Sequence, residues 1–584
     1  MTVLEHDRLA FAETAPSGGE GPVTRGRLRR TFGLYAVACV LGYMPTLTGM
    51  SPALQAAGLG LWFPGAGFLA SSGWSLPLLP VALACFAVAV FAWFGAGLVL
   101  APFIVWLAFA ALAGALAGDA VWSPAAALVP LSTFAFFGVL AFRDARKGKA
   151  DRAHLQMRQA FLPQALSEAA RTAAPVPQPG ARELSPEQLA ALRYALDRAL
   201  QPVGQYGGYN RIDQFQTASL RYQINTLSYT LALIQTHYAP SFHGYLSDAQ
   251  VKLTETYLAK QVWGYWVYET AWGHLNLTNF DPAGRDNIML TGWLGLQLGL
   301  HMSASGDFRY AEPGSLPFRL NAGKTFEHSI HTLAESVVAN YERADFCIYP
   351  CEPNWLYPIC NHYGMTFLAI YDRLFGTDHA QRIMPSWVES LDTEFTDRKG
   401  SIIGLRSELT GIEFPFPTGE IAYAGFENAF LPDRARRLWA VARTELRMAL
   451  QSGADGRNRI LMPGKGFDFG NYKPGWLGAY ASIMSAAREF GDEELAAAAE
   501  LSAAEACGKR IEDGVLRYEG GSNLTNLAML QASVRGRDDY RNAIVAGPPK
   551  ACLSGPVLAR ATYPDVLVAR AWSDGEGLEL VLHP

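Results

Sequence analysis

Three cysteines lie close together in a chain that has seven in all: Cys347, Cys351 and Cys360 fall within the segment CIYPCEPNWLYPICN. Their intervals of four and nine residues lack the close pairs and the local histidine of a zinc site. A disulfide is disfavoured in the reducing compartment that the membrane topology indicates. Two interpretations remain open: the thiols do acid–base or nucleophilic work, or they are ordinary buried cysteines.

Carboxylates offer further candidate groups. Glu352 follows Cys351 directly, and either supports that thiol or faces water. Asp213 precedes a helical pattern, where an aspartate serves as an N-cap or, in apolar surroundings, as an acid of raised pKa. Glu352, Glu413 and Glu420 are the acids that a glycosidase would need as a pair, but cysteine- and tryptophan-rich surroundings fit a sugar cleft poorly. The glycine-rich loop around Asp468 and Lys473 lacks the spacing of a phosphate cradle.

The thiol segment also carries a family resemblance. CEPNWLYPICN, the following LAIYDRLFGTDH and the earlier DNIMLTGWLGLQLGL together resemble the linalool dehydratase/isomerase family. The resemblance extends from about Tyr222 to Tyr518 at low identity. It does not cover the apolar N-terminal region or the C-terminal tail.

The resemblance implies a set of site residues. Cys351 and Cys360 fall on the two pocket cysteines of the family, Tyr222 on its catalytic tyrosine and Asp213 on an aspartate contributed across a subunit boundary. The resemblance and the neighbouring sequence also give the residues expected to bind the substrate or shape its pocket. They are Met289, Trp293, Glu352, Trp355 and Tyr423. Trp293 stands where the family has a histidine, and the Asp213 assignment requires a deletion of about 18 residues. The family also implies a closed ring of five subunits with shared pockets.

These residues suit the dehydration of an allylic alcohol. The reaction needs one group to protonate the leaving hydroxyl and another to remove a proton from a neighbouring carbon, in a dry pocket. We expect Asp213 or Cys360 to be the acid, with Tyr222 hydrogen-bonded to it, and Cys351 to be the opposing base or a nucleophile. No metal or other cofactor is expected. The predicted function is a hydro-lyase/isomerase acting on a terpenoid or related tertiary or allylic alcohol, converting linalool to myrcene and interconverting linalool and geraniol. The alternatives are a non-catalytic terpenoid-binding or scaffold protein and an α/α-toroid glycosidase.

The chain that must position these residues starts with an apolar region that is predicted to lie in a membrane. Residues 31–142 carry one formal charge, Asp119. Four apolar stretches of about 18 to 20 residues match the thickness of a bilayer core, and they are Thr31–Gly49, Leu76–Phe94, Gly97–Leu116 and Ala125–Phe142. A weaker fifth candidate, Leu59–Ser72, contains Pro64 and three glycines and is predicted to be a re-entrant or interfacial loop.

Arginine and lysine clusters flank this region on both sides. Arg25, Arg27, Arg29 and Arg30 precede the first span, and five basic residues from Arg143 to Arg152 follow the last. Under the positive-inside rule both clusters are cytoplasmic, which an even number of spans satisfies. We therefore predict a multi-pass protein of the inner or cell membrane whose catalytic domain is cytoplasmic. Membrane lipid and a small lipophilic alcohol are the expected partners. The net charge of −5 and the absence of a basic stripe argue against nucleic acid.

The rest of the chain reads as helical. Ser185, Pro186 and Glu187 have the order of a helix N-terminus. Similar helical blocks separated by long aromatic loops suggest an (α/α)6 toroid, and a helical solenoid and an irregular bundle, which share the same periodicity, are the alternatives. The last 45 residues alternate and predict a small β-rich segment. The expected class is all-α, with five parts: a cytoplasmic tail (1–30), a transmembrane domain (31–142), a basic juxtamembrane helix and Pro-rich linker (143–184), a catalytic barrel (185–540) and the β-rich segment (541–584).

Overall fold

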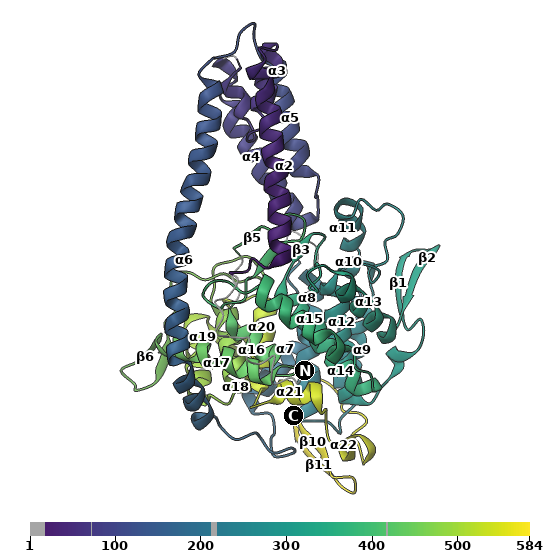
Figure 1. Ribbon diagram of the computed structural model, residues 1–584. Helices are drawn as coiled ribbons and strands as arrows, with labels where there is room; N and C mark the ends of the chain where they lie inside the picture. The colour runs from purple at the N-terminus through teal and green to yellow at the C-terminus, as the bar shows by residue number, and fades with distance from the viewer. Residues whose placement is uncertain (1–17, 72, 212–218, 416–418) are drawn as a thin grey trace.

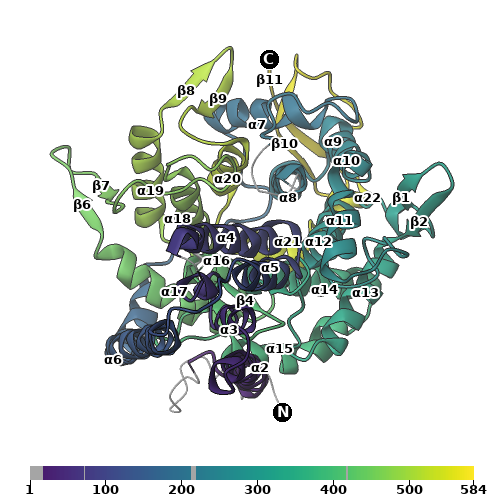
Figure 2. The same cartoon turned by 90° about the horizontal axis from the view of Figure 1, so that it is seen from above.

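The computed structural model describes residues 18–71, 73–211, 219–415 and 419–584. A group of long N-terminal helices projects from one end of a rounded helical domain (Figure 1). Seen along the direction of that projection, the helical domain is a ring of paired helices (Figure 2). The predicted Asp213 lies outside the described residues.

Each predicted membrane span falls on one projecting helix. The four helices are α2 (Pro22–Leu47), α4 (Leu78–Ala96), α5 (Ala101–Ala115) and α6 (Ala125–Thr172). Two helical stretches, Gly73–Ala96 and Ala125–Thr172, are long and apolar enough to cross a membrane. At 1.5 Å per residue, the 15 residues of α5 reach only about 22 Å. Two candidate spans are thus found, and a four-span region stays a prediction.

The weaker fifth candidate is not a continuous helix. It contains the end of α3 (Pro52–Leu59), a run of turns and a short 3₁₀ helix, η2 (Ala66–Leu69). α3 packs against α2 and α5. Gly42 and Gly58 allow the closest approach, because a Cβ on Gly42 would stand 2.3 Å from the carbonyl oxygen of Gly58. The segment therefore lies among the projecting helices, as a broken rather than a spanning element.

Six helices contact one another in a closed cycle within the described part of the chain. In chain order this inner ring is α8 (Ser219–His237), α12 (Ile288–Ser305), α14 (Pro358–Phe375), α16 (Glu420–Glu427), α18 (Leu477–Glu489) and α20 (Asn523–Val534). α12 is buried at every position, as a helix surrounded by protein must be.

An outer helix accompanies each inner one. The outer helices are α7 (Pro186–Ala199), α9 (Gly244–Tyr257), α13 (Ile330–Arg343), α15 (His379–Glu394), α17 (Pro432–Arg447) and α19 (Glu493–Ala506). α7 begins as its sequence predicts, because Ser185 accepts a hydrogen bond from the Gln188 backbone and forms a reciprocal capping box. Since an outer helix returns the chain after each inner helix, the inner helices run in one direction and begin at one end of the ring.

Short elements complete the ring. α10 (Lys260–Trp263) and α11 (Tyr265–Gly273) lie between α9 and α12, and a three-stranded sheet is formed by β3 (Trp355–Leu356), β4 (Leu405–Ser407) and β5 (Glu413–Phe414). Two-stranded hairpins are β1–β2 (Leu316–Asn321, Lys324–His328), β6–β7 (Leu450–Ser452, Asn458–Ile460) and β8–β9 (Lys509–Glu512, Val515–Tyr518). The chain ends in α21 (Asp539–Val545), α22 (Lys550–Ser554) and the antiparallel hairpin of β10 (Leu567–Ser573) and β11 (Leu578–His583). The last part of the predicted β segment is therefore β structure, whereas its first part is helical.

Three contacts fasten the projecting helices to the ring. The Glu394 carboxylate accepts hydrogen bonds from the first amides of α2, Val23 and Thr24, at 2.9 and 3.0 Å. At the end of α4, the Trp93 ring lies 4.6 Å from the Trp355 ring. Arg158 of α6 is buried and binds Glu420 at 2.9 Å and Glu445 at 2.7 Å. The inner and outer rings thus hold all three helices at fixed places.

Candidate functional site

The loop between α13 and α14 brings two of the three clustered cysteines together. Its shape is set by Asn361, whose side-chain amide donates to the backbone oxygens of Tyr349 and Tyr357, each at 3.0 Å, while its oxygen accepts from the Tyr349 amide at 3.2 Å. Cys351 and Cys360 are free, buried thiols within hydrogen-bonding contact of each other. They are neighbours in space although nine residues separate them.

The Cys351 thiol is held in its protonated form. Burial raises its pKa well above the ordinary value, and Cys360 and Glu352 raise it further, while Arg221 acts in the opposite direction. A protonated thiol donates a proton and cannot accept one. Cys351 can therefore serve as the predicted base only after another group has taken its proton.

Tyr222 and Met289 meet at the starts of α8 and α12. The Tyr222 hydroxyl lies 3.6 Å from the Met289 sulfur. The fully buried Arg221 guanidinium donates to both groups, at 3.1 Å to the hydroxyl and 2.6 Å to the sulfur. Tyr222 remains partly accessible, and its pKa is raised mainly by burial, with Glu352, Cys360 and Cys351 adding to the effect. The predicted tyrosine, methionine and thiols therefore belong to one cluster.

Trp293 forms an aromatic wall of this cluster. Its ring stacks on Tyr363 with centroids 3.6 Å apart and lies 4.8 Å from the Tyr222 ring. Its indole N–H is buried and has no hydrogen-bond partner among the described residues. An unpartnered buried donor costs free energy, and here it is available to an oxygen atom of a bound molecule. Trp293 can thus supply a hydrogen bond where the family has a histidine.

Sequence reasoning missed a buried acid, Glu269, that interacts with Glu352 and Arg221. Glu269 of α11 is 2% exposed, and neither carboxyl oxygen has a hydrogen-bond partner within the described ranges. Burial and the neighbouring Glu352 raise its pKa well above the ordinary value, against the effect of Arg221. A signal for it existed, because Glu269 is the one charged residue from Gln261 to Gly273. It is also four positions from Tyr265, on the buried face of a helix.

The remaining predicted residues lie in different places. Trp355 is buried under α4, where its indole donates to the Trp93 carbonyl oxygen at 3.3 Å, so its N–H is occupied by protein. Tyr423 is fully buried, with its ring 4.7 Å from that of His362, two residues beyond Cys360. Asp213 falls in the stretch that the structure does not describe. Trp355 therefore borders the cluster from the membrane-helix side rather than presenting a free polar group to it.

Four of the site residues share one position in the ring. Tyr222, Met289, Cys360 and Tyr423 each lie in the first turn of an inner helix. The N-terminal ends of these parallel helices carry partial positive charge, which stabilises a nearby carboxylate or developing negative charge. The site is thus at the ring end that faces α4.

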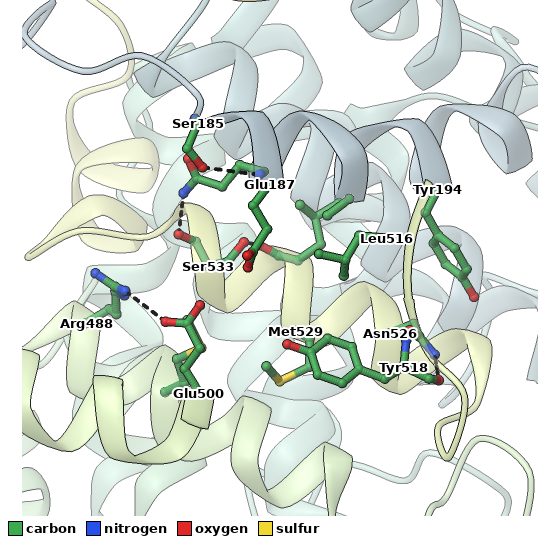
Figure 3. A pocket seen from close by; sticks show the side chains of 14 residues that line it. Ser185, Glu187, Tyr194, Arg488, Glu500, Leu516, Tyr518, Asn526, Met529 and Ser533 are labelled. Carbon is green, nitrogen blue, oxygen red and sulfur yellow. Dashed lines mark hydrogen bonds and ion pairs between the residues drawn. The ribbon is translucent and has the colours of Figure 1, made fainter. Parts of the chain in front are cut away.

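A separate hollow of about 310 Å³ lies between α7 and α20 (Figure 3). Its lining is largely polar and includes Glu187, Arg488, Glu500, Tyr518 and Ser533. Arg488 and Glu500 form an ion pair of 3.5 Å across it, and the Gln188 amide donates to the Ser533 carbonyl oxygen at 2.7 Å. None of the predicted site residues lines this hollow, so it is distinct from the thiol cluster.

Comparisons with known proteins single out the same region of the chain. The family described as linalool dehydratase/isomerase matches residues 221–524, which include every predicted site residue except Asp213. Among solved structures, an unsaturated glucuronyl hydrolase specific for heparin is similar with 12% identity and a TM-score of 0.37, covering 63% of this chain and 96% of its own. An unsaturated glucuronyl hydrolase from Streptococcus agalactiae has 10% identity and a TM-score of 0.35, covering 60% and 92%. Likenesses this distant say nothing about the reaction.

Proposed function

The chain belongs to the linalool dehydratase/isomerase family, and from that premise we propose that it is a cofactor-independent hydro-lyase and isomerase of a terpenoid or related allylic alcohol. The reactions are the loss of water from linalool to give myrcene and the interconversion of linalool and geraniol. The observation that carries the proposal is the buried cluster of proton donors, Tyr222, Cys351 and Cys360, beside the aromatic wall of Trp293.

The cluster suits the bond changes of the reaction. A proton from Cys360 or Asp213 goes to the hydroxyl oxygen, with Tyr222 as a hydrogen-bonding partner, and the carbon–oxygen bond breaks to release water and leave an allylic cation. The thiolate or carboxylate that gave up its proton then takes one from an adjacent carbon, directly or through Cys351, to give the diene. Return of water to the other end of the allylic system, with loss of a proton to the same base, gives the isomeric alcohol. The ring faces of Trp293 and Tyr363 stabilise positive charge, and burial protects it from bulk water.

The setting in which this reaction occurs is part of the proposal. Four spans would anchor the protein in the inner or cell membrane, with the ring in the cytoplasm. This topology is supported by the basic segments of α2 and α6, because both lie against the ring: Arg27 of α2 pairs with Asp345, and Asp144, within the basic segment of α6, binds Arg398 of the ring at 2.9 Å. Five copies would form a closed assembly in which a neighbour completes each pocket. The partners are then lipid and a lipophilic alcohol.

The test is anaerobic incubation of the detergent-solubilised protein with linalool, followed by gas chromatography for myrcene and geraniol. We expect product from the wild type, at least a hundredfold less from Cys351→Ala and Cys360→Ala, and wild-type rates from Cys507→Ala. Cys507 is a matched control because it is also a free, buried cysteine, at the end of the outer helix α19. Failure of a panel of allylic alcohols with a folded protein would contradict the proposal and favour a non-catalytic terpenoid-binding role.

A further inference from the structure

The outward side of α11 and of the loop that follows it carries a group of large, exposed apolar side chains. Tyr268, Trp272, Leu275 and Leu277 are 61%, 44%, 60% and 73% exposed, and these four side chains form the α11 face. The Tyr268 and Trp272 rings lie 5.7 Å apart, one helical turn from each other. Single exposed apolar residues are normal on a soluble surface, whereas four within ten residues mark a contact surface.

The segment that carries the α11 face exposes no charged group between Lys260 and Asp281. The sequence has one formally charged residue between these two, Glu269, and it is 2% exposed. His274 is largely buried as well, since its side chain is 7% exposed and binds Asp286 at 2.7 Å. A surface of this kind can move from water into lipid without the cost of desolvating an ion.

The opposite side of α11 is fixed to the ring and to the site. Trp266 is 1% exposed, and the Tyr265 hydroxyl donates to the Asn287 side-chain oxygen at 2.8 Å. The Tyr265 ring lies 4.1 Å from the Arg221 guanidinium, which donates to the Met289 sulfur of the site. Because its inner side is held in this way, α11 presents the α11 face as a fixed surface of the ring.

The turn that ends α4 touches α11 at two points. A Cβ on Gly97 would lie 3.5 Å from the Glu269 Cα, and one on Gly273 would lie 3.3 Å from the Gly97 carbonyl oxygen. Gly73–Ala96 is long and apolar enough to cross a membrane. α11 stands on the ring beside the foot of the projecting helices (Figure 1). The α11 face is thus next to the end of a candidate membrane span.

Basic residues on two other projecting helices mark the same level. Arg30, the last charged residue before the apolar part of α2, donates to the Leu409 carbonyl oxygen of the ring. Arg143 begins the charged part of α6, and its neighbour Asp144 binds Arg398 of the ring at 2.9 Å. Because arginine is enriched where a membrane helix leaves the bilayer on its cytoplasmic side, these contacts place the membrane surface at the end of the ring from which the helices project.

We infer that the α11 face inserts into the lipid headgroup region, an inference that rests on the proposed anchoring. Tryptophan and tyrosine are favoured at this depth because their rings are apolar and carry one polar group, and Leu275 and Leu277 add apolar surface. The lack of exposed charge and the contact with α4 favour lipid over a second copy of the chain as the partner. One helix, about 10 Å across, then separates lipid from the site.

The test attaches an environment-sensitive fluorophore to Leu277→Cys in the full-length protein, reconstituted in phosphatidylcholine vesicles. The background carries Cys85→Ala and Cys347→Ala, because the other five cysteines are buried. We expect blue-shifted emission from position 277 and a loss of intensity with spin-labelled lipid. The loss should be larger when the nitroxide is near the headgroup than when it is near the end of the acyl chain.

Two further labelled positions are controls. Val88→Cys, on α4, is at a position 67% exposed in the protein, and reports independently whether α4 lies in the bilayer. Leu582→Cys is at a position 47% exposed on β11, which lies at the end of the molecule opposite the projecting helices (Figure 1). We expect quenching at position 88, strongest with the nitroxide near the chain end, and none at position 582.

The outcomes separate the inference from the proposed anchoring. Quenching at position 88 without quenching at position 277 would overturn the inference and leave the anchoring intact. Blue-shifted emission at position 277 that spin-labelled lipid does not quench would also overturn it, because protein then covers the α11 face. Quenching at position 277 alone would support the lipid contact and contradict the span of α4, and no quenching at either position would contradict both.

Discussion

At the residue scale, burial raises the pKa of the acid Glu269, and the buried Arg221 acts against this effect. Glu352 raises this pKa further. Replacing Arg221 with methionine removes the cation but leaves its buried partners in place, and removal of one partner of a buried charge pair costs about 3 to 5 kcal/mol, so the folded state of the variant is checked by its thermal midpoint. Without the cation, the acids of the pocket keep their protons to higher pH. We expect Arg221→Met to move the alkaline limb of the pH–rate profile upward and to lower the rate near neutrality, measured over pH 5 to 9.

An unmoved profile with unchanged rate would show that the guanidinium does not act on the reacting acids. Arg373→Met is a suitable control, because Arg373 is a partly buried arginine that binds the carbonyl oxygen of Ile544 and the Ser303 hydroxyl and not the Tyr222 hydroxyl or the Met289 sulfur. It should leave the profile where it is.

A second buried acid links stability to pH. Burial raises the pKa of Glu489 to about 7, against the hydrogen bonds that it accepts from the amides of Tyr540 and Arg541 and from Asn428. Because the folded-state pKa lies above the usual value of about 4.3, the contribution of this group to stability is full below pH 4.3. It is lost as the pH rises through 7, by roughly 3 kcal/mol in all. Thermal midpoints taken from pH 4 to 8 should fall with pH in the wild type. The slope should be shallower in Glu489→Gln, and equal slopes would contradict the assignment.

Prediction from sequence succeeded for residues with a distinctive neighbourhood. Cys351 and Cys360 share a short segment with Asn361, so their proximity needed only one loop. Glu269 and Arg221 lie 48 residues apart on different helices, and neither belongs to the quoted family motifs. Trp355 is conspicuous in the sequence, yet its partner Trp93 comes from α4, which is 262 positions earlier. Long-range pairing of this kind leaves no local pattern.

At the element scale, the end of α4 is a structural part of the site wall. Trp93 packs on Trp355, and Gly97 lies against α11. Truncating a buried tryptophan typically costs 3 to 5 kcal/mol, and here the loss falls on the contact between α4 and the ring. We expect Trp93→Ala to accelerate amide hydrogen exchange in α11 and β3, measured by mass spectrometry in detergent. Trp74→Ala, at an exposed position, is the control and should change neither segment.

The helices could be predicted from sequence where a long apolar stretch or a capping motif defines them. α7 begins at the predicted cap, and each predicted span falls on a helix. Boundaries set by tertiary contacts were not predictable. α6 runs without interruption from Ala125 to Thr172, because the ring binds its polar half through Arg158. A hydropathy pattern ends at Phe142, where the lipid-facing residues end, and cannot show that the helix continues.

At the scale of the whole molecule, the expected assembly has a direct measure. A chain of 63.5 kDa that closes into rings of five should give a detergent-corrected protein mass of about five times that value. Light scattering coupled to size-exclusion chromatography measures it. A monomer with full alkenol activity would show that each pocket is complete without a neighbour, and would remove the reason for assigning Asp213 to a partner's site.

The docking of α4 against α11 also determines which concentration of the proposed substrate controls the rate of the enzyme. If the pocket is filled from the bilayer, its occupancy follows the mole fraction of alcohol dissolved in lipid, not its concentration in water. Adding inert phospholipid at constant total alcohol would then dilute the substrate in two dimensions and slow the enzyme, although nothing has changed in the aqueous phase. Rates would collapse onto one curve only when plotted against surface concentration, and an inhibitor's potency would scale with its oil–water partition coefficient.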